Sequence, residues 1–546
     1  MAGEPTVTTA ADDEAFDAIV VGAGHNGLTA AAYLARAGCR VLVLERRAVV
    51  GGAAVTEEVI PGHRVSTASY IASMLMPTVI RDLDLGRRGL RMVACDPILT
   101  VPVGGERIIR WWADVDRTAE EIAQYSAADA LAFVDVDRRL KALAAYLQPF
   151  FLETPPDLAA AGPLARLREA WRLFRRFRSL KGKEAGEMVT FMTGSLADFL
   201  DRHFEADETK RMILANSVYG KHGGPYEPGS AVGLLFHLLA GGDHGVQGFN
   251  GHVIGGMGAI TEALADAARE HGARILTNAQ VLRIDVANGA TTGVTLADGR
   301  TFRAPVVLSN ADPKRTFLGM VPGQALPEAF RRDVAAIRMN GPAAKLNLAL
   351  SGEPRVLGRP ADADPRERAL LTIAPTLESA QRCSDMARFG EIADELWIDC
   401  VIPSLIDDTL CPPGHHMLTC FIQFVPYHLR EGTWDERREE LAASVIRQIT
   451  RHMPDLPELI LGQRLYTPLD LERTFGLTEG NIFHGDLATG ALFSMRPTPA
   501  WSQYRTPVQG LYLCGAGAHP GGGVTGAPGH NAAQAVLRDG MARGRR

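Results

Sequence analysis

The sequence contains no run of about 18 or more apolar residues in its 546 positions. A helix needs about 20 such residues to cross a bilayer, so the sequence predicts no membrane-spanning helix. Residues 1–15 also lack the basic start and apolar centre of a secretory signal, and the arginines of a mitochondrial transit peptide. We interpret this segment as a disordered tail and expect a cytoplasmic protein.

Seven cysteines are scattered along the chain, and none of them form a C-x-x-C pair. That absence argues against a dithiol redox centre of the thioredoxin reductase kind and against a zinc site, so no metal is predicted. Isolated cysteines suit free thiols in a reducing compartment. The net charge is −6, from 57 basic and 63 acidic residues, which gives no electrostatic reason to expect a nucleic-acid partner.

A G-x-G-x-x-G sequence near the N-terminus has an informative context. Residues 18–21 (AIVV) predict a short buried strand, and the turn GAGHNG at 22–27 follows directly. Residues 26–37 predict a helix, residues 40–44 predict a second strand, and Glu45 comes next. A strand, a glycine turn, a helix, a strand and an acid at these distances indicate the first half of a dinucleotide-binding fold.

Each residue type in this segment has a physical reason. Gly22 lets the chain turn tightly, Gly24 lets a pyrophosphate approach the backbone, and Gly27 lets helix and strand pack closely. The free N–H groups and the positive end of the helix dipole then face the phosphates. Glu45 lies where a carboxylate accepts hydrogen bonds from both ribose hydroxyls, which favours a free 2′-OH over a 2′-phosphate.

A second pair of glycines favours FAD over NAD. Gly51 and Gly52 come a few residues after Glu45 and Arg46, and this arrangement resembles the extended FAD signature of flavoprotein oxidoreductases and amine oxidases. Another glycine-rich helix start at 255–258 (GGMG) lacks the final glycine and a ribose acid. We therefore predict no built-in NAD(P)H domain.

Later segments predict the remainder of the nucleotide fold. Residues 250–315 contain a glycine-rich helix start, a strand, a three-stranded meander and a further apolar strand. The predicted fold class is α/β: a Rossmann-like FAD-binding domain of the glutathione reductase or amine oxidase type, with an inserted α+β substrate domain. We assign 16–106, 250–315 and 500–546 to the FAD domain, and 107–249 and 316–499 to the substrate or cap domain.

Two segments of the insertion predict amphipathic helices. Residues 118–146 carry apolar residues at spacings near three and four, and Thr118 with Glu121 predicts a capping box at their start. Residues 163–183 combine an apolar face with eight basic residues. Such a helix suits peripheral contact with an anionic membrane, whereas the same apolar face can also pack on its own domain. Both interpretations stay open.

The C-terminal segment predicts a strand at 511–514, a long glycine-rich loop at 515–529 and a final helix that ends at Leu537. Its glycines let the backbone lie against a flat ring system. The positive end of the helix would then point at the ligand, where it would stabilise the negative charge of a reduced flavin.

The chain resembles the phytoene desaturase-like flavoproteins, which include carotenoid desaturases, isomerases and ketolases. The similarity lies in GAGHNGL, ERRAVVGGAAVTEE, SNADP, GNIFHGD and HPGGGVTGAPG, and it is nearest to the branch called pyridine nucleotide-disulfide oxidoreductase domain-containing protein 2. The resemblance implies FAD as the cofactor, with the adenine beside the backbone of Val281. The residues that we predict to bind FAD are Gly22, Ala23, Gly24, His25, Asn26, Gly27, Glu45, Arg46, Gly51, Gly52, Ala53, Val281, Gly515, Ala516, His519, Gly523, Val524 and Gly526.

The predicted activity is that of an FAD-dependent oxidoreductase of the dehydrogenase or desaturase type. It would move a hydride from a small apolar substrate, isoprenoid or lipid-like, to flavin N5, and a quinone or oxygen would reoxidise the flavin. A redox-neutral isomerase, an amine oxidase and a non-catalytic FAD-binding regulatory protein stand as alternatives. No catalytic residue is assigned; His519 is the preferred candidate for a group near the flavin, ahead of His484, Arg496 and Tyr70.

Overall fold

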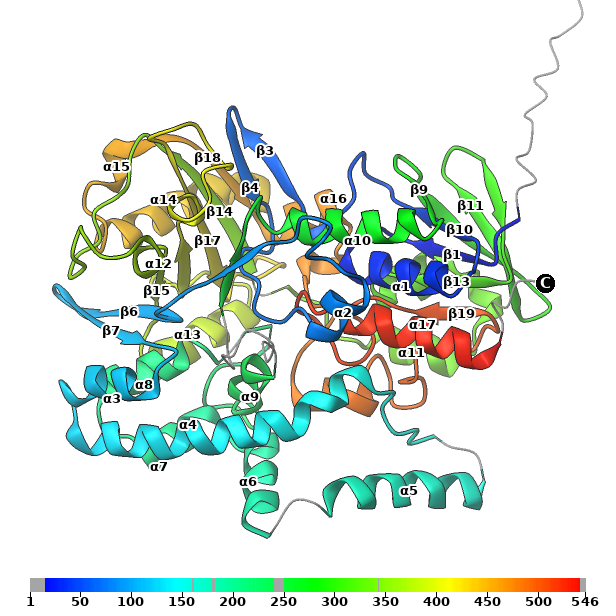
Figure 1. The fold of residues 1–546 in the computed structure, drawn as a ribbon, viewed down its shortest axis with the longest axis horizontal. Coiled ribbons are helices and arrows are strands. Elements are labelled where there is room, and N and C mark those ends of the chain that lie inside the picture. The colour runs from blue at the N-terminus through cyan, green and yellow to red at the C-terminus, as the bar shows by residue number, and fades with distance from the viewer. Residues whose placement is uncertain are drawn as a thin grey trace, which may run out of the picture.

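The computed structural model describes residues 15–159, 162–178, 182–217, 219–220, 222–239, 250–341 and 343–540 (Figure 1). Two five-stranded sheets occupy opposite halves of the molecule, and helices pack around both. The predicted tail at 1–15 lies outside the described residues except for Ala15, and so do residues 541–546. Within the described ranges, no helix has the length and apolar character needed to cross a membrane.

The first sheet is parallel and contains the predicted strands of the nucleotide fold. Its order is β19-β13-β1-β2-β9, and every neighbouring pair is parallel. Its three central strands are fully buried apolar runs, as expected for strands covered on both faces. The strands are β1 (Ala18–Val21), β2 (Val41–Leu44), β9 (Arg274–Leu276), β13 (Val306–Ser309) and β19 (Leu511–Leu513). The predicted Rossmann-like fold class is confirmed.

Three helices pack together beside this sheet. The first helix, α1 (His25–Arg36), contacts both α10 (Gly258–Glu270) and α17 (Ala527–Asp539), and it lies between them (Figure 1). A β-carbon on Gly529 of α17 would come within 2.0 Å of the Asn26 carbonyl oxygen. The backbone of α17 therefore lies directly against the backbone of α1. The predicted meander is formed by β10 (Val281–Ala287), β11 (Ala290–Leu296) and β12 (Thr301–Arg303).

The second sheet is antiparallel throughout and has the order β15-β16-β17-β14-β18. The apolar segments 345–350, 395–401 and 416–425 each overlap a strand of this sheet. The sequence pattern did not predict β15, which is only four residues long, or β18, which is half exposed. The strands are β14 (Ala343–Leu350), β15 (Leu370–Ile373), β16 (Ile398–Val401), β17 (His416–Gln423) and β18 (Ile460–Tyr466).

The prediction of one helix over 118–146 is wrong, because two helices occupy this region. Asp114 caps α3 (Val115–Ala123), and Ser126 caps α4 (Ala127–Leu147), each by accepting a hydrogen bond from a backbone N–H of the first turn. The predicted capping box also fails, since the Thr118 hydroxyl instead bonds to the backbone of Trp112. A second cap residue inside the apolar repeat divides it into two helices.

The basic segment 163–183 is likewise divided. Helix α5 covers Pro163–Phe177 and α6 covers Gly182–Thr193, while residues 179–181 lie outside the described part of the chain. In Figure 1, α5 lies at the edge of the molecule, away from both sheets.

Three two-stranded sheets, two of them hairpins, and the remaining helices complete the fold. The hairpin of β6 and β7 spans the predicted domain boundary at 106/107, and β6 contacts β15 of the antiparallel sheet. The paired strands are β3 (Thr56–Ile60) with β4 (His63–Ser66), β5 (Met92–Ala94) with β8 (Gly251–Val253), and β6 (Leu99–Gly104) with β7 (Arg107–Trp111). The other helices are α2 (Pro77–Asp82), α7 (Leu196–His203), α8 (Asp207–Leu214), α9 (Val232–Leu238), α11 (Glu328–Ala335), α12 (Pro365–Arg368), α13 (Leu377–Arg388), α14 (Trp434–Thr450), α15 (Leu456–Leu459) and α16 (Pro468–Phe475).

Candidate functional site

A cleft of about 280 Å³ opens at the carboxyl edge of the parallel sheet. Gly22 follows β1, Glu45 follows β2 and Asn310 follows β13, so the cleft lies where ligands bind in folds of this type. We call it the glycine cleft. The predicted FAD-binding residues on its walls are Gly22, Gly24, His25, Asn26, Glu45, Arg46, Gly52, Ala53, Val281 and Ala516.

Glycines are required in the turn because backbone groups fill the space where side chains would be. A β-carbon on Gly27 would lie 2.2 Å from the Gly22 carbonyl oxygen. Gly51 has a φ of 124° and donates its N–H to the Ala23 carbonyl at 2.9 Å. A β-carbon on Gly52 would lie 3.2 Å from Gly24 Cα. The second glycine pair therefore packs directly on the first turn, and bare backbone faces the cleft.

The charged groups of the cleft fit a nucleotide diphosphate. The Glu45 carboxylate, buried at the end of β2, accepts hydrogen bonds from the Ala23 N–H at 2.8 Å and the Arg47 N–H at 2.9 Å. Burial, and then the positive charge of Arg315, lower the pKa of Arg46. The buried Nε of Arg315 has no hydrogen-bond partner among the described residues. A guanidinium with an unsatisfied donor, beside a second guanidinium, suits the pyrophosphate of FAD.

The first residues of α1 also present unused polar atoms. Within the described structure, neither Asn26 Oδ1 nor His25 Nε2 has a partner, although both atoms are buried. Burial, and then the neighbouring His484, lower the pKa of His25 to about 4. Such atoms are costly unless a ligand or water binds them, so they support the fit of a cofactor to this cleft.

The tail loop, 515–526, reaches both the cleft and a second cavity. Ala516 lines the glycine cleft, and Gly523 with Val524 lines the second cavity. A β-carbon on Gly515 would come within 2.6 Å of the Asn310 carbonyl oxygen. Gly526 has a φ of 72° and forms the N-cap of α17. The loop is therefore held against β13 by backbone contacts that glycine alone permits.

The structure does not bring His519 to the other predicted residues. His519 lines neither cavity, and its Nε2–H donates to the Phe150 carbonyl at 2.8 Å. Burial lowers its pKa to about 4. Five other predicted residues do not line the cleft either: Ala23, Gly27, Gly51, Gly515 and Gly526.

Arg496 joins the tail loop by hydrogen bonds to the glycine-rich segment that precedes it in the chain. Its Nε donates to the Ala516 carbonyl at 2.8 Å, and its Nη1 donates to the Asp486 carbonyl at 2.8 Å. Its Nη2 donates to the Phe483 carbonyl. Burial lowers the pKa of Arg496 to about 10, which leaves the guanidinium charged near neutral pH. This residue positions the loop and lies on the wall of neither cavity.

The second cavity, of about 160 Å³, lies between the glycine cleft and the antiparallel sheet. We call it the apolar cavity, because most of its wall is hydrocarbon, including Ile71, Met74, Leu99, Leu370, Phe421 and Leu487. His25, Ala53 and Ile482 line both cavities. A flavin ring held by the cleft would therefore meet a substrate held by the cavity.

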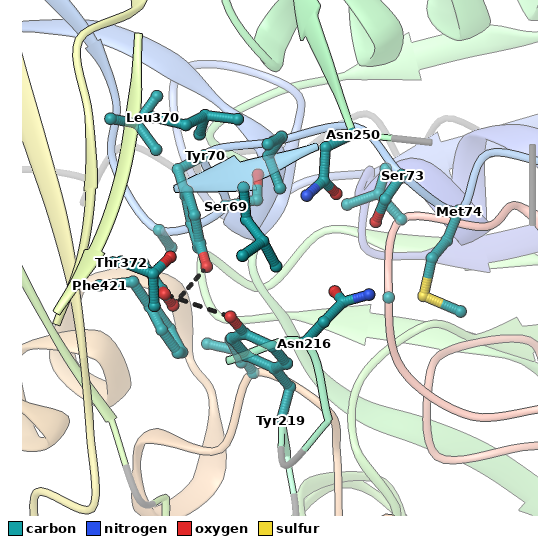
Figure 2. Close-up of a pocket in the computed structure, with 18 of the residues that line it drawn as sticks. Ser69, Tyr70, Ser73, Met74, Asn216, Tyr219, Asn250, Leu370, Thr372 and Phe421 are labelled. Atoms are coloured by element: carbon teal, nitrogen blue, oxygen red, sulfur yellow. Dashed lines mark hydrogen bonds between the residues drawn. The ribbon is translucent and has the colours of Figure 1, made fainter. Parts of the chain in front are cut away.

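Three polar side chains stand together on the wall of the apolar cavity (Figure 2). Asp399 of β16 accepts a hydrogen bond from the Tyr70 hydroxyl at 3.0 Å, and the Tyr219 hydroxyl lies 3.2 Å from its other oxygen. Burial raises the pKa of Asp399 to about 6, although its hydrogen bonds to Tyr70, Thr372 and Tyr219 lower it. We call Tyr70, Asp399 and Tyr219 the carboxyl cluster.

The number of protons in the carboxyl cluster limits which of its contacts can be hydrogen bonds at the same time. The Tyr219 hydroxyl also lies 2.8 Å from the Ala215 carbonyl oxygen, which can only accept. A hydroxyl has one proton. Both Tyr219 contacts can therefore be hydrogen bonds at the same time only when Asp399 carries a proton. When Asp399 is ionised, the single Tyr219 proton is shared between Asp399 and the Ala215 carbonyl.

A buried amine lies behind the cluster. The Nζ of Lys345, on β14, is 4.3 Å from the centroid of the Tyr70 ring, and it has no hydrogen-bond partner among the described residues. Burial lowers the pKa of this amine to about 7, while the nearby Cys420 and Asp399 raise it. Lys345 does not line the cavity, and its amine faces the Tyr70 ring from behind the wall.

The sequence pattern pointed to Tyr70 but not to Asp399, Tyr219 or Lys345. The available signal was a single charged residue inside an apolar strand, in LWIDCV at 396–401 and in AAKLNLAL at 343–350. A buried charge in such a strand needs a partner or a role. Tyr219 carries no comparable signal in the sequence.

Comparison with known families agrees with this geometry. Residues 27–537 match the model of the flavin containing amine oxidoreductases. The chain belongs to this family. It is 39% identical to pyridine nucleotide-disulfide oxidoreductase domain-containing protein 2 of Rattus norvegicus, over 96% of this chain and 94% of the relative. The predicted branch is thus confirmed, and the chain is an FAD-dependent oxidoreductase.

The chain is also similar to more distant relatives, and it shares its fold with a solved structure. A limonene dehydrogenase component of Castellaniella defragrans is 26% identical over 96% of this chain and 94% of its own. Hydroxyneurosporene desaturase of Cereibacter sphaeroides is 29% identical over 96% and 98%. The crystal structure of an oxidoreductase from Methanosarcina mazei shares the fold, with a TM-score of 0.59 and 18% identity over 95% of this chain and 99% of that one.

Proposed function

We propose that this flavoenzyme dehydrogenates a small apolar substrate, isoprenoid or lipid-like, inside the apolar cavity. The observation that carries the proposal is the shared wall of the two cavities, where His25 and Ala53 border both. A hydrocarbon substrate would be held by the burial of its apolar surface. The names of two relatives, a limonene dehydrogenase component and a hydroxyneurosporene desaturase, support this substrate class.

The residues along the glycine cleft favour one orientation of bound FAD. The backbone N–H groups after Gly24 and the guanidinium of Arg315 would hold the pyrophosphate, Glu45 would accept from the ribose, and Val281 would border the adenine. The tail loop with Gly523 would then border the ring, because Gly523 and Val524 line the apolar cavity.

Dehydrogenation removes a hydride and a proton from the substrate, and the two need separate acceptors. Bound FAD supplies the hydride acceptor. The carboxyl cluster supplies the proton acceptor: the Asp399 carboxylate takes the proton, directly or through the hydroxyl of Tyr70 or Tyr219. Asp399 is suited to this task because its pKa of about 6 lies near neutrality.

The proposal is tested by mixing the FAD-loaded protein with limonene in the absence of oxygen and recording the visible flavin spectrum. We expect the oxidised flavin bands to bleach, and the product to contain one more double bond. Readmission of air, or addition of a soluble quinone, then identifies the acceptor by the faster return of colour. Failure of limonene and of a longer acyclic isoprenoid to bleach a flavin that dithionite reduces would contradict the proposal.

Amine oxidation is the second candidate, and one feature of the cavity favours it. The rings of Tyr70 and Phe421 stack with centroids 5.3 Å apart, and Tyr219 adds a third aromatic wall beside the Asp399 carboxyl. Aromatic faces and a carboxylate together bind an ammonium group. Benzylamine would then bleach the flavin under conditions in which limonene does not.

A further inference from the structure

Helix α5 presents its apolar stripe to solvent. Leu164, Leu167, Trp171 and Phe174 are 82%, 66%, 57% and 64% exposed. Their spacing of three, four and three residues places them on one face of the helix. Large apolar side chains in a continuous exposed row are unusual on a monomeric surface and mark an interaction site.

The opposite side of α5 is the side that contacts the protein. Glu169 is buried, and its carboxylate lies 3.5 Å from the Arg172 guanidinium. Arg172 in turn donates to the Thr154 carbonyl at 2.9 Å. Arg172 therefore attaches this side of the helix to the preceding segment, and the apolar stripe faces away from its own domain.

The stripe is bordered by positive charge. Residues 163–178 contain six arginines and a single acid, Glu169, whereas the whole chain has a net charge of −6. Arg166, Arg168, Arg175 and Arg178 are exposed, and the guanidinium of Arg175 lies 4.9 Å from the Trp171 ring centroid. Aromatic and aliphatic anchors inside a rim of arginines match the interface of an anionic bilayer.

We propose that α5 is a membrane-docking surface, which lies flat on an anionic lipid bilayer with Leu164, Leu167, Trp171 and Phe174 inserted among the acyl chains. A helix of 15 residues is about 22 Å long at 1.5 Å per residue, which suits an in-plane position and is too short to span. A second copy of the chain is disfavoured as the occupant, because a symmetric contact would bring two arginine-rich faces together. The proposal does not depend on the substrate.

The test is sedimentation of the full-length FAD-loaded protein with vesicles of phosphatidylcholine alone or with added phosphatidylglycerol. We expect binding to the anionic vesicles, weakened by salt, and little binding to phosphatidylcholine alone. The double variant Trp171→Ser/Phe174→Ser should bind at least about tenfold more weakly, and so should Arg168→Glu/Arg175→Glu. The matched control is Phe389→Ser, at an aromatic residue that is 70% exposed elsewhere and should bind as the wild type does.

Circular dichroism and the flavin spectrum establish that each variant is folded. Absence of binding to anionic vesicles by the folded wild-type protein would overturn the proposal. So would binding that the serine variants leave unchanged, since another surface would then carry it. Vesicle-free dimerisation that the serine variants abolish would also overturn it, because the stripe would then be an interface between two copies.

Discussion

The glycine cleft and the apolar cavity share a wall but are specified in different ways. The cleft is shaped by backbone: a β-carbon on Gly27 would come 2.2 Å from a carbonyl oxygen, and Gly22 and Gly51 adopt positive φ values. The cavity is shaped by side chains, and its polar centre joins Tyr70 and Asp399, which are 329 residues apart in the chain. Cofactor binding is thus encoded locally, whereas substrate chemistry is encoded by the packing of distant strands.

This contrast implies that substitutions in the cleft and in the cavity should have different effects on the enzyme. Changes in the cleft should remove the cofactor and, with it, every activity. Changes in the carboxyl cluster should leave the cofactor bound and alter only the chemistry, because Asp399 and Tyr219 do not line the cleft.

The largest effect is expected for Gly27→Ala. The added methyl group would overlap the Gly22 carbonyl oxygen, so α1 must move away from the turn. Overpacking of this kind costs about 3 kcal/mol or more, and we expect the protein to purify without FAD. FAD content per chain and the thermal unfolding temperature measure both effects. Gly86→Ala, where no atom lies within 4 Å of the added carbon, is the control, and a fully loaded Gly27→Ala protein would refute the explanation.

The second effect is expected for Asp399→Asn, which removes the proton acceptor and keeps the shape of the side chain. We expect flavin reduction by the productive substrate to slow by about 10²-fold or more, with FAD content unchanged. In the wild type the rate should rise with pH through about 6, because only the ionised Asp399 accepts a proton. Stopped-flow flavin reduction across this range should show no such rise in the variant. An unchanged rate and pH profile would remove Asp399 from the mechanism.

The same substitution should change how stability depends on pH. The folded pKa of Asp399, about 6, is above the value of about 3.9 in unfolded chains. As the pH rises from about 4 to 6, the unfolded chain releases this proton before the folded protein does, so the wild type loses stability in this window. Asp399→Asn should lose less over the same window, which thermal unfolding at a series of pH values will measure.

A smaller effect is expected for Arg496→Lys. Lysine keeps the charge but cannot reach the carbonyls of Ala516, Asp486 and Phe483 together. Loss of one charged hydrogen bond costs about 1.5 kcal/mol, so we expect about tenfold weaker FAD binding, measured by equilibrium ultrafiltration. Arg382→Lys, on the exposed face of α13, should bind FAD normally. Unchanged affinity in the Arg496 variant would show that the tail loop is held by its other contacts.

The smallest effect is expected for Tyr219→Phe. The hydrogen bond from Tyr219 lowers the pKa of Asp399, so its removal should move the pH-dependent rise of flavin reduction upward, by less than about one pH unit. The maximal rate should change little, since Tyr70 still contacts Asp399. A downward shift would contradict the assigned direction of this hydrogen bond.

The sequence was sufficient to predict those parts of the structure that depend on residues close together in the chain. The turn at 22–27, the meander and the tail loop were predicted because each is a short pattern of glycines, apolar runs and turns. The division of 118–146 into α3 and α4 was missed because the apolar repeat continues across Ser126, which caps the second helix. The carboxyl cluster was missed because its members meet only after the antiparallel sheet has formed.

The contact between the first and last helices has a consequence for how the protein is made. Strand β19 supplies one edge of the parallel sheet, and α17 packs on α1 with the Gly529 position beside the Asn26 carbonyl. A nascent chain emerging from the ribosome has its glycine turn within the first 30 residues but lacks this edge strand until residue 511 has been translated. The parallel sheet can therefore be completed only after the antiparallel sheet, whose strands end at Tyr466, has been translated. FAD binding that needs the complete parallel sheet can thus follow only after the antiparallel sheet has been translated.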